Sequence, residues 1–571
     1  MKIARSRKAA TCAAIVLAFT SLILLRAIPK EKDDVPDVKF TLRTELVLIP
    51  TVVTDKSGNH VTGLKKEDFT VLENGAEQKI TTFEEVSSTS NRFSRRDVAN
   101  EFSNSVAADA SSRRITLVVL DFINTRFADQ ATAREELLKY LTQSVDEREP
   151  TALYTLNRTG IHVIHDFTTD PRILVAALHE VNGDPDQLVD SPSDSAGGGS
   201  GGSGGGHISK GSVHKEAASI QGMMHEAEAN FRSFEQRLAI EYTLEAMQQV
   251  AQALGGYPGR KSLIWASGGF PFTVSGSMGI APAGRDTLTD VLPMYERTWD
   301  LLNNAQISLY PVDVRGLRMV GMPSAAKSGG SSMRNPSHSF SHASSRQMDT
   351  EATFQTFASM TGGRAYYNSN DLVKGFRDAV NDSSEYYMLG YYLDHSNTKS
   401  GWRKLSVKVN RDHMEVRARD GFFVTNATVD PETTRNSDIS SALQSPLDYT
   451  SLSLLAHWTK TELAQEQGKK RAIYQIHVSP DAGVVNEAEN NHVVLDFVAQ
   501  AIAPDGKTAG QPVGQKVDVH LTADKLKVIR SQGVLYNGAL ELPPGEYTVR
   551  FVVRDDLSGR TGSVSGPLKV D

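Results

Sequence analysis

Four segments of the chain are nearly continuous runs of apolar residues, and they are separated by stretches with helical spacing of their apolar positions. The runs cover residues 115–120, 152–156, 262–266 and 307–312. Continuous apolar runs of this length are typical of parallel strands that are buried on both faces. The alternation of strand and helix therefore predicts an α/β domain over residues 113–383, in which the four runs lie side by side and point the same way.

Two stretches within this domain are rich in serine and glycine and cannot bury apolar surface. They cover residues 184–215 and 321–346, and we expect both to be mobile insertions. Residues 87–112 are rich in Ser, Asn and Arg, which indicates a linker that precedes the domain.

Short strands with turn signals flank the α/β domain on both sides. Residues 38–90 form an N-terminal β region, which includes an Asn-Gly hairpin signal at Asn74. Strands within residues 384–425 could complete the same sandwich, since neither group is large enough to stand alone. Residues 437–571 alternate apolar and polar positions, which predicts a C-terminal sandwich of immunoglobulin type.

The first residues of the chain have the pattern of an export signal. A positively charged start is followed by an uncharged, mostly apolar run from Ala9 to Leu25, and no clear cleavage site follows this run. Residues 1–29 are therefore either a cleaved signal peptide or an uncleaved membrane anchor. Both alternatives predict that the rest of the chain is exported to the periplasm or the cell exterior, with an inner-membrane anchor in the second case.

Charge and cysteine content exclude two classes of site. The formal net charge is −7, so no broad basic face is expected and nucleic acid is not a predicted partner. The only cysteine, Cys12, lies within the N-terminal apolar run. The exported part of the chain is therefore expected to have neither a disulfide nor a thiolate metal site.

Asp121 is the leading candidate for a functional residue because it directly follows the first apolar run, at the end of the expected strand. Ligands of open parallel sheets lie beyond the carboxyl ends of the strands, where this side chain is expected. The alternative is a turn residue that bonds backbone amides at the end of a strand. Ser267 ends a later run between small residues, but Trp265 stands where the nucleophile elbow of a hydrolase needs glycine.

The succession of motifs resembles the von Willebrand factor type A (VWFA) domain, and more closely the exported VWFA-related proteins of acidobacteria. This resemblance implies a doubly wound α/β fold with a mostly parallel sheet, flanked by all-β regions. The matching segments span nearly all of the chain after the N-terminal run: Asp55–Leu64, Asp68–Gly75, Leu120–Thr125, Tyr310–Gly316, Thr361–Asn368, Tyr386–Tyr391, Arg417–Phe422 and Leu542–Tyr547.

The resemblance also implies a Mg²⁺ site, which is degenerate in this chain. Family members hold the ion with an Asp-x-Ser-x-Ser loop and with an aspartate after a later strand. Asp121 and Thr125 match the first and fifth positions of that loop, whereas Ile123 offers no oxygen at the third. Ser267 begins Ser-Gly-Gly where Thr-Asp-Gly is expected, so that carboxylate is absent; Asn124 and Ser267 are the available substitutes.

These observations predict an exported, non-enzymatic protein that mediates protein–protein or cell-envelope interactions. The alternatives are a structural envelope scaffold without a ligand site and, in a different class, an uncharacterised hydrolase. Cofactors other than Mg²⁺ are not expected. The sequence leaves the partner and the oligomeric state open.

Overall fold

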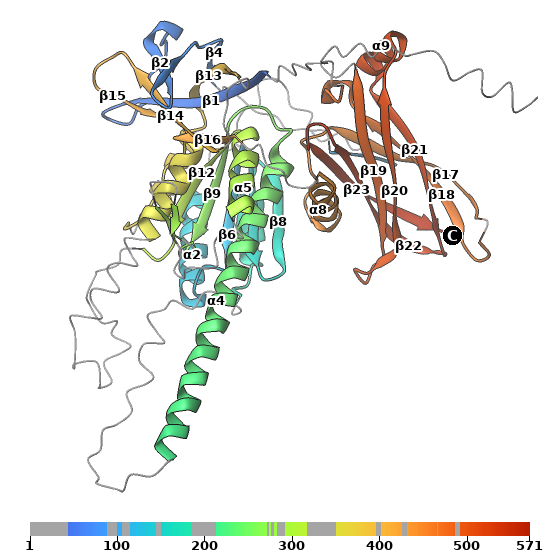
Figure 1. The fold of residues 1–571 in the computed structure, drawn as a ribbon, viewed down its shortest axis with the longest axis horizontal. Helices are drawn as coiled ribbons and strands as arrows, with labels where there is room; N and C mark the ends of the chain where they lie inside the picture. Colours follow the sequence, from blue (N-terminus) through green and yellow to red (C-terminus); the bar gives the residue numbers. More distant parts are fainter. Residues whose placement is uncertain are drawn as a thin grey trace, which may run out of the picture. The chain divides into compact units, whose positions relative to one another are not determined.

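The computed structural model describes residues 44–87, 100–104, 115–143, 150–184, 213–270, 273–275, 279–281, 292–316, 350–369, 371–394, 401–424, 431–464, 466–485 and 491–571. These residues belong to one compact unit that extends from Thr44 to Asp571 (Figure 1). The predicted signal or anchor over residues 1–29 and the insertion over residues 321–346 lie outside them, as does most of the insertion over residues 184–215. Among the described helices, none is long and apolar enough to span a membrane.

One five-stranded sheet contains the four apolar runs. Its strand order is β12 (Ile307–Asp313), β9 (Lys261–Ser267), β6 (Ile115–Asp121), β7 (Thr151–Asn157) and β8 (Gly160–Thr168). The first four strands pair in parallel, which confirms the prediction that the four runs lie side by side and point the same way. β8 is antiparallel to β7, because a tight turn reverses the chain between Asn157 and Gly160.

Helices cover both faces of this sheet. Leu117 and Val119 of β6 share a core with α4 (Val213–Leu254) and α5 (Leu292–Asn304). Their neighbours Val118 and Leu120 share a second core with α2 (Phe127–Gln143), α3 (Pro171–His179) and α7 (Leu372–Asn381). Successive side chains of a strand point to opposite faces, so an apolar run fills both cores at once.

The predicted fold class, a doubly wound α/β fold with a mostly parallel sheet, is wrong. Of the five described sheets with at least four strands, four are wholly antiparallel, and the fifth is mixed because of β8. The prediction generalised from four apolar runs, whereas most strands of the chain alternate apolar and polar positions and pair with antiparallel neighbours. The two short strands β10 (Thr273–Ser275) and β11 (Gly279–Ala281) are also antiparallel.

The strand groups before and after the helices share two antiparallel sheets. In the first sheet, β1 (Thr44–Asp55) lies between β13 (Glu385–Asp394) and β15 (Met414–Arg417), and β4 (Thr82–Ser87) flanks β13. The second sheet has the order β16 (Gly421–Val424), β14 (Gly401–Val409), β2 (Phe69–Glu73) and β3 (Ala76–Gln78), with the short helix η1 (Lys66–Asp68) before β2. Both sheets contribute to one core, so neither group folds around its own residues alone.

Two further antiparallel sheets form the C-terminal part and share one core. The first of them has the order β21 (Val534–Leu542), β18 (Lys470–Val478), β17 (Leu454–Leu463) and β5 (Glu101–Ser103). The second has the order β20 (Thr508–His520), β19 (His492–Ile502), β22 (Gly545–Asp555) and β23 (Thr561–Val570). Three helices accompany them: α8 (Pro431–Gln444), α9 (Ala523–Gln532) and η6 (Pro480–Ala482).

β5 corrects the prediction that residues 87–112 are only a linker. Its residues pair with β17, and the buried Asn104 that follows donates to the carbonyl oxygens of Tyr449 and Leu452. A three-residue strand is too short for its alternation to be visible in the sequence, and the partner that stabilises it lies more than three hundred residues further along the chain.

Candidate functional site

Strand register brings the candidate residues together at one edge of the mixed sheet. Asp121 ends β6 and Ser267 ends the adjacent parallel strand β9, where Leu120 lies beside Ala266. Asn124 and Thr125 follow in the loop after β6. All four residues are buried. The four residues lie together because neighbouring parallel strands end at the same edge of a sheet.

The carboxylate of Asp121 accepts four hydrogen bonds from its own chain. Oδ1 accepts from the backbone amide of Asn124 at 3.0 Å. Oδ2 accepts from Asn124 Nδ2 at 2.8 Å, from Trp265 Nε1 at 2.9 Å and from Ser267 Oγ at 2.9 Å. A carboxylate offers about two lone-pair sites on each oxygen, so the three donors use all of the accepting capacity of Oδ2, and one donor uses part of that of Oδ1.

Burial and hydrogen bonding act on this carboxyl group in opposite directions. Asp121 is only 1 % exposed, and the loss of hydration raises its pKa, while the donors from Asn124, Trp265 and Ser267 lower it. The loss of hydration is the larger effect. Any change that removes a donor therefore leaves a buried acceptor without compensation.

The other residues of the loop are held by similar internal bonds. Thr125 Oγ1 accepts from the backbone amide of Gly268 at 2.9 Å. The Asn124 amide also donates to Thr243 Oγ1 of α4 at 2.9 Å, and Gln130 Nε2 of α2 donates to the carbonyl oxygen of Thr125 at 3.0 Å. The loop thus links β6 to β9 and to helices on both faces of the sheet.

The residues present do not fit a Mg²⁺ cage in this arrangement. Mg²⁺ requires about six oxygen ligands in octahedral geometry. Both Asp121 oxygens and Thr125 Oγ1 already accept hydrogen bonds. The single hydroxyl proton of Ser267 is shared between Asp121 Oδ2 and the carbonyl oxygen of Gly269, and Ser267 Oγ accepts from the backbone amide of Gly269 at 3.2 Å. Asn124 Oδ1 is the one oxygen of these four side chains that is buried without a hydrogen-bond partner. Elsewhere in the described part of the chain, no cluster of three or more His, Cys, Asp or Glu side chains has metal-site geometry.

Trp265 is the member of this cluster that the sequence interpretation missed. It lies two residues before Ser267, so both side chains leave β9 on the same face. A buried indole N–H usually finds a hydrogen-bond acceptor, and Asp121 is that acceptor here. The period of two from Ser267 is the signal that could have identified it.

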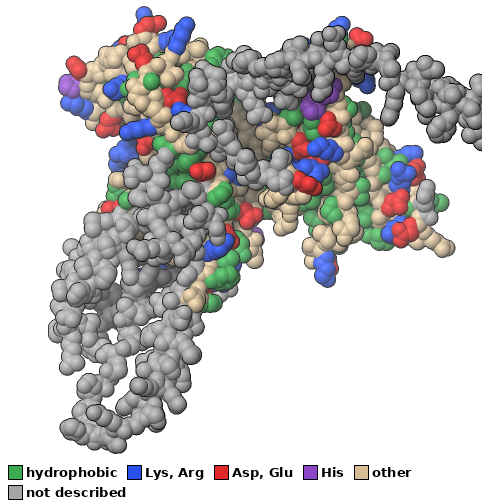
Figure 2. Space-filling model, in the orientation of Figure 1, with side chains coloured by type: hydrophobic (Ala, Val, Ile, Leu, Met, Phe, Trp, Pro, Cys, Tyr) green, Lys and Arg blue, Asp and Glu red, His purple; other side chains and the backbone are tan. Residues whose placement is uncertain are grey.

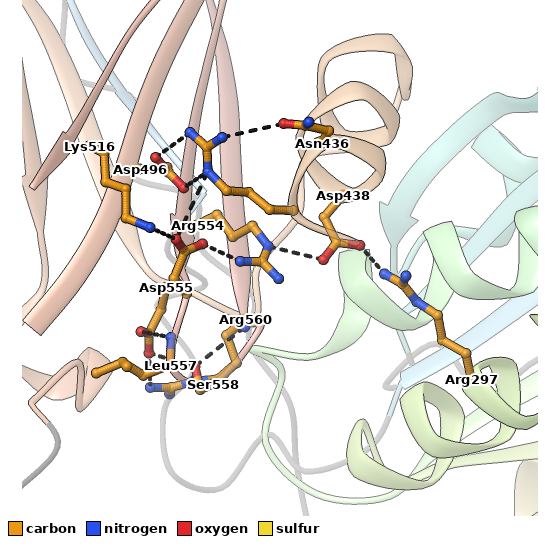
Figure 3. A network of polar contacts seen from close by, with 12 residues as sticks. Arg297, Asn436, Asp438, Asp496, Lys516, Arg554, Asp555, Leu557, Ser558 and Arg560 are labelled. Carbon is orange, nitrogen blue, oxygen red and sulfur yellow. Dashed lines mark hydrogen bonds and ion pairs between the residues drawn. The ribbon is translucent and has the colours of Figure 1, made fainter. Parts of the chain in front are cut away.

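A second polar cluster, the Asp438 network, connects the C-terminal sheets to the helices of the mixed sheet (Figure 3). Asp438 of α8 accepts from Arg554 of β22 at 3.0 Å and from Arg297 of α5. Arg554 also donates to Asp556, which accepts from Lys516 at 2.7 Å. Arg435, one turn before Asp438 on α8, forms a bidentate ion pair with Asp496 of β19. The network positions α8 between two parts of the chain.

Lys261 is a buried ammonium group at the start of β9. Its Nζ donates to the carbonyl oxygen of Ala305 at 2.6 Å. Burial lowers the pKa of this group to about 7, because the charged form loses its hydration. The unfolded chain holds the same proton with a pKa near 10.4, so the cost of burial is present in full below pH 7 and decreases as the pH rises above it.

We therefore expect the free energy of unfolding to rise between pH 7 and about pH 10, and the variant Lys261→Met to lack this rise. At pH 6 the variant is expected to be more stable than the wild type by on the order of a few kcal/mol. Urea denaturation at several pH values measures both effects, with the exposed Lys507→Met as a matched control. A Lys261→Met effect of the same size at every pH would contradict the prediction.

Comparison of the sequence with models of known protein families and with curated proteins finds no match. The resemblance to VWFA-related proteins therefore has only the quoted motifs in its favour, and function must be argued from the geometry of the site.

Proposed function

We propose that this is an exported, non-enzymatic protein that binds a partner protein or a component of the cell envelope. The observation that carries the proposal is the state of the best-placed polar residues. Asp121 is 1 % exposed and accepts four internal hydrogen bonds, and Ser267 is 0 % exposed. General acids, bases and nucleophiles must reach the substrate, which these two groups cannot do in this conformation.

The same residues have a clear structural role. Asp121 and Thr125 connect β6 to the end of β9, and Asn124 connects the loop to α4. Hydrogen bonds within the chain hold this edge of the sheet in one conformation. A rigid edge of this kind suits a protein that presents a fixed surface to a partner. This favours recognition over chemistry at the carboxyl ends of the strands.

Photo-crosslinking of the full-length protein in the cells that produce it tests the proposal. We expect one protein or envelope component to be enriched reproducibly, to the same extent with EDTA or with Mg²⁺ and in the variant Ser267→Ala. The purified wild type is expected to show no turnover in a broad hydrolase panel. Turnover that Ser267→Ala abolishes, or capture that EDTA abolishes, would contradict the proposal.

A further inference from the structure

The strand β20 forms one edge of a C-terminal sheet and is far more exposed than the strand beside it. Among the described strands, β19 is its only neighbour in the sheet. Every residue of β19 between its first and its last is buried, whereas only Ala509 and Val517 of β20 are even partly buried. An exposed edge strand presents a row of backbone N–H and C=O groups with which a further strand can pair.

The direction of these backbone groups follows from a hydrogen bond just beyond the end of β20. The amide of Leu521 donates to the carbonyl oxygen of Asn491 at 3.1 Å, which continues the register of β20 with β19. In an antiparallel pair, alternate residues of a strand direct their N–H and C=O groups to the same neighbour. The odd-numbered residues from 513 to 519 therefore bond to β19. The even-numbered residues from 514 to 520 direct their backbone groups away from it.

Two residues limit the part of this edge that can pair with another strand. Pro512 has no backbone N–H, which is tolerated on the outer side of an edge strand but cannot donate to a further strand. Thr522 is the N-cap of α9, and its hydroxyl accepts from the backbone amide of Lys525 at 3.5 Å. The stretch that can pair is therefore residues 514–520, which is about 20 Å of extended chain.

We infer that this stretch pairs with the same stretch of a second copy of the chain, antiparallel, about a two-fold axis at Val517. In this register Gly514 faces His520 of the second copy, and Lys516 faces Asp518. All four outward-directed residues of each copy then take part, which gives about eight backbone hydrogen bonds. Two-fold symmetry makes each of these contacts occur twice.

The two neighbouring registers fit less well. An axis at residue 516 would bring Pro512 into the ladder and place Lys516 opposite the same residue of the second copy. An axis at residue 518 would require Thr522 at the start of α9 and would place Asp518 opposite itself. Each of them loses backbone hydrogen bonds and sets like charges opposite each other, which destabilises a strand pair.

The proposed register sets opposite charges against each other without needing new ion pairs. The ammonium group of Lys516 already lies 2.7 Å from Asp556 of its own chain, and the side chain is 45 % exposed. Asp518 likewise lies 2.7 Å from His492 and is 58 % exposed. Both partners can stay in place when the strands pair, because the ladder is made by the backbone. The charges select the register by excluding like-charged pairs.

Two exposed valines of β20 lose exposed surface in the same arrangement. Val513 is 40 % exposed and Val519 is 41 % exposed. They share a face of the strand, since an even number of residues separates them. In the proposed pair Val513 lies diagonal to Val519 of the second copy, so each covers part of the other. Figure 2 shows hydrophobic side chains at the surface of the C-terminal part, among charged ones. The inference does not depend on the proposed function.

Disulfide trapping in the full-length protein tests the register. In a Cys12→Ser background, which removes the only native cysteine, the double variant Gln515→Cys/Val519→Cys is expected to form a covalent dimer under mild oxidation. The two positions face each other across the two-fold axis as a pair without mutual backbone bonds, with Cα atoms about 4.5 Å apart. Within one strand they are about 14 Å apart, too far for an internal bridge.

The single variants Gln515→Cys and Val519→Cys are the controls and are expected to stay uncrosslinked, because neither position faces itself in this register. No crosslinking by the double variant, or equal crosslinking by a single variant, would overturn the proposal. Crosslinking of the double variant to a different protein instead of a second copy would overturn it as well.

Sedimentation of the full-length protein, without added cysteines, tests the backbone ladder. We expect the wild type to dimerise and Asp518→Pro to weaken dimerisation at least about tenfold, because proline removes an outward N–H at two symmetric places. That N–H points away from β19, so the variant is expected to stay folded, which thermal melting checks. Asp518→Ala keeps the N–H and is expected to weaken the dimer less. A monomeric wild type, or equal effects of the two variants, would contradict the inference.

Discussion

The variant Asp438→Ala is expected to lower the free energy of unfolding by about 3–5 kcal/mol. Asp438 is buried between two guanidinium groups, Arg554 of β22 and Arg297 of α5, and both lose an anionic partner when it is removed. Arg554 is buried and would keep only Asp556 as an anionic partner, so less of its cost of desolvation would be compensated. Urea denaturation followed by tryptophan fluorescence measures the loss.

A double-mutant cycle separates the charge effect from the loss of packing. In an Arg297→Met background, Asp438→Ala is expected to cost at least about 1 kcal/mol less than in the wild type, because one of the two cations is already absent. The exposed residue Asp524 provides the control Asp524→Ala, for which we expect a change below about 1 kcal/mol. Additive effects of Arg297→Met and Asp438→Ala would show that the two side chains are not coupled.

The variant Asp121→Asn is expected to destabilise the protein by about 2–4 kcal/mol at neutral pH. The new amide group would place a donor opposite Asn124, Trp265 or Ser267, all of which donate to Oδ2 in the wild type. Volume and shape are nearly unchanged, so the loss reports hydrogen bonding rather than a cavity. Chemical denaturation measures it.

Asp505→Asn is the matched control for that variant, since Asp505 lies in an exposed turn between β19 and β20. Its effect is expected to stay within about 1 kcal/mol. If Asp121→Asn and Asp505→Asn lowered the free energy of unfolding by similar amounts, the buried hydrogen bonds of Asp121 would not contribute to stability as proposed.

The sequence predicted the parallel part of the structure because that part is encoded locally. Apart from Thr116 and Ser262, residues 115–120 and 262–266 are apolar on both faces of the strand, and helices follow both segments in the chain. A strand that is apolar on both faces is buried best in a sheet that has a hydrophobic core on each side. The position of Asp121 beside Ser267 then follows from the register of β6 and β9.

The antiparallel sheets, which make up most of the fold, could not be predicted from the local sequence pattern in the same way. β1 has a mixed pattern, and its two neighbours, β13 and β15, come from residues more than three hundred positions later. β5 is recognised as a strand only through its pairing with β17. Such pairings depend on contacts between distant segments, which local periodicity does not encode. The domain boundaries predicted from the sequence remain predictions.

The polar clusters also differ in how far the sequence predicts them. Asp121 was identifiable because it ends a strand, and Thr125 because of its position in the motif that resembles the VWFA loop. The Asp438 network, in contrast, joins residues of α5, α8 and β22 that no local pattern connects. The predicted Mg²⁺ ligands do lie together, yet their oxygen atoms are largely committed to hydrogen bonds within the chain. The residue types alone did not show that these oxygen atoms accept hydrogen bonds within the chain.

Thermal melting of the full-length wild type with and without Mg²⁺ tests most directly whether the Asp121 cluster is an internal structural hub. We predict the same melting temperature, within about 1 °C, without the ion and at about 10 mM Mg²⁺, and a lower but equally Mg²⁺-independent value for Asp121→Asn. A rise of several degrees with Mg²⁺ in the wild type that is absent in Asp121→Asn would contradict the account, because it would show that this carboxylate holds a cation.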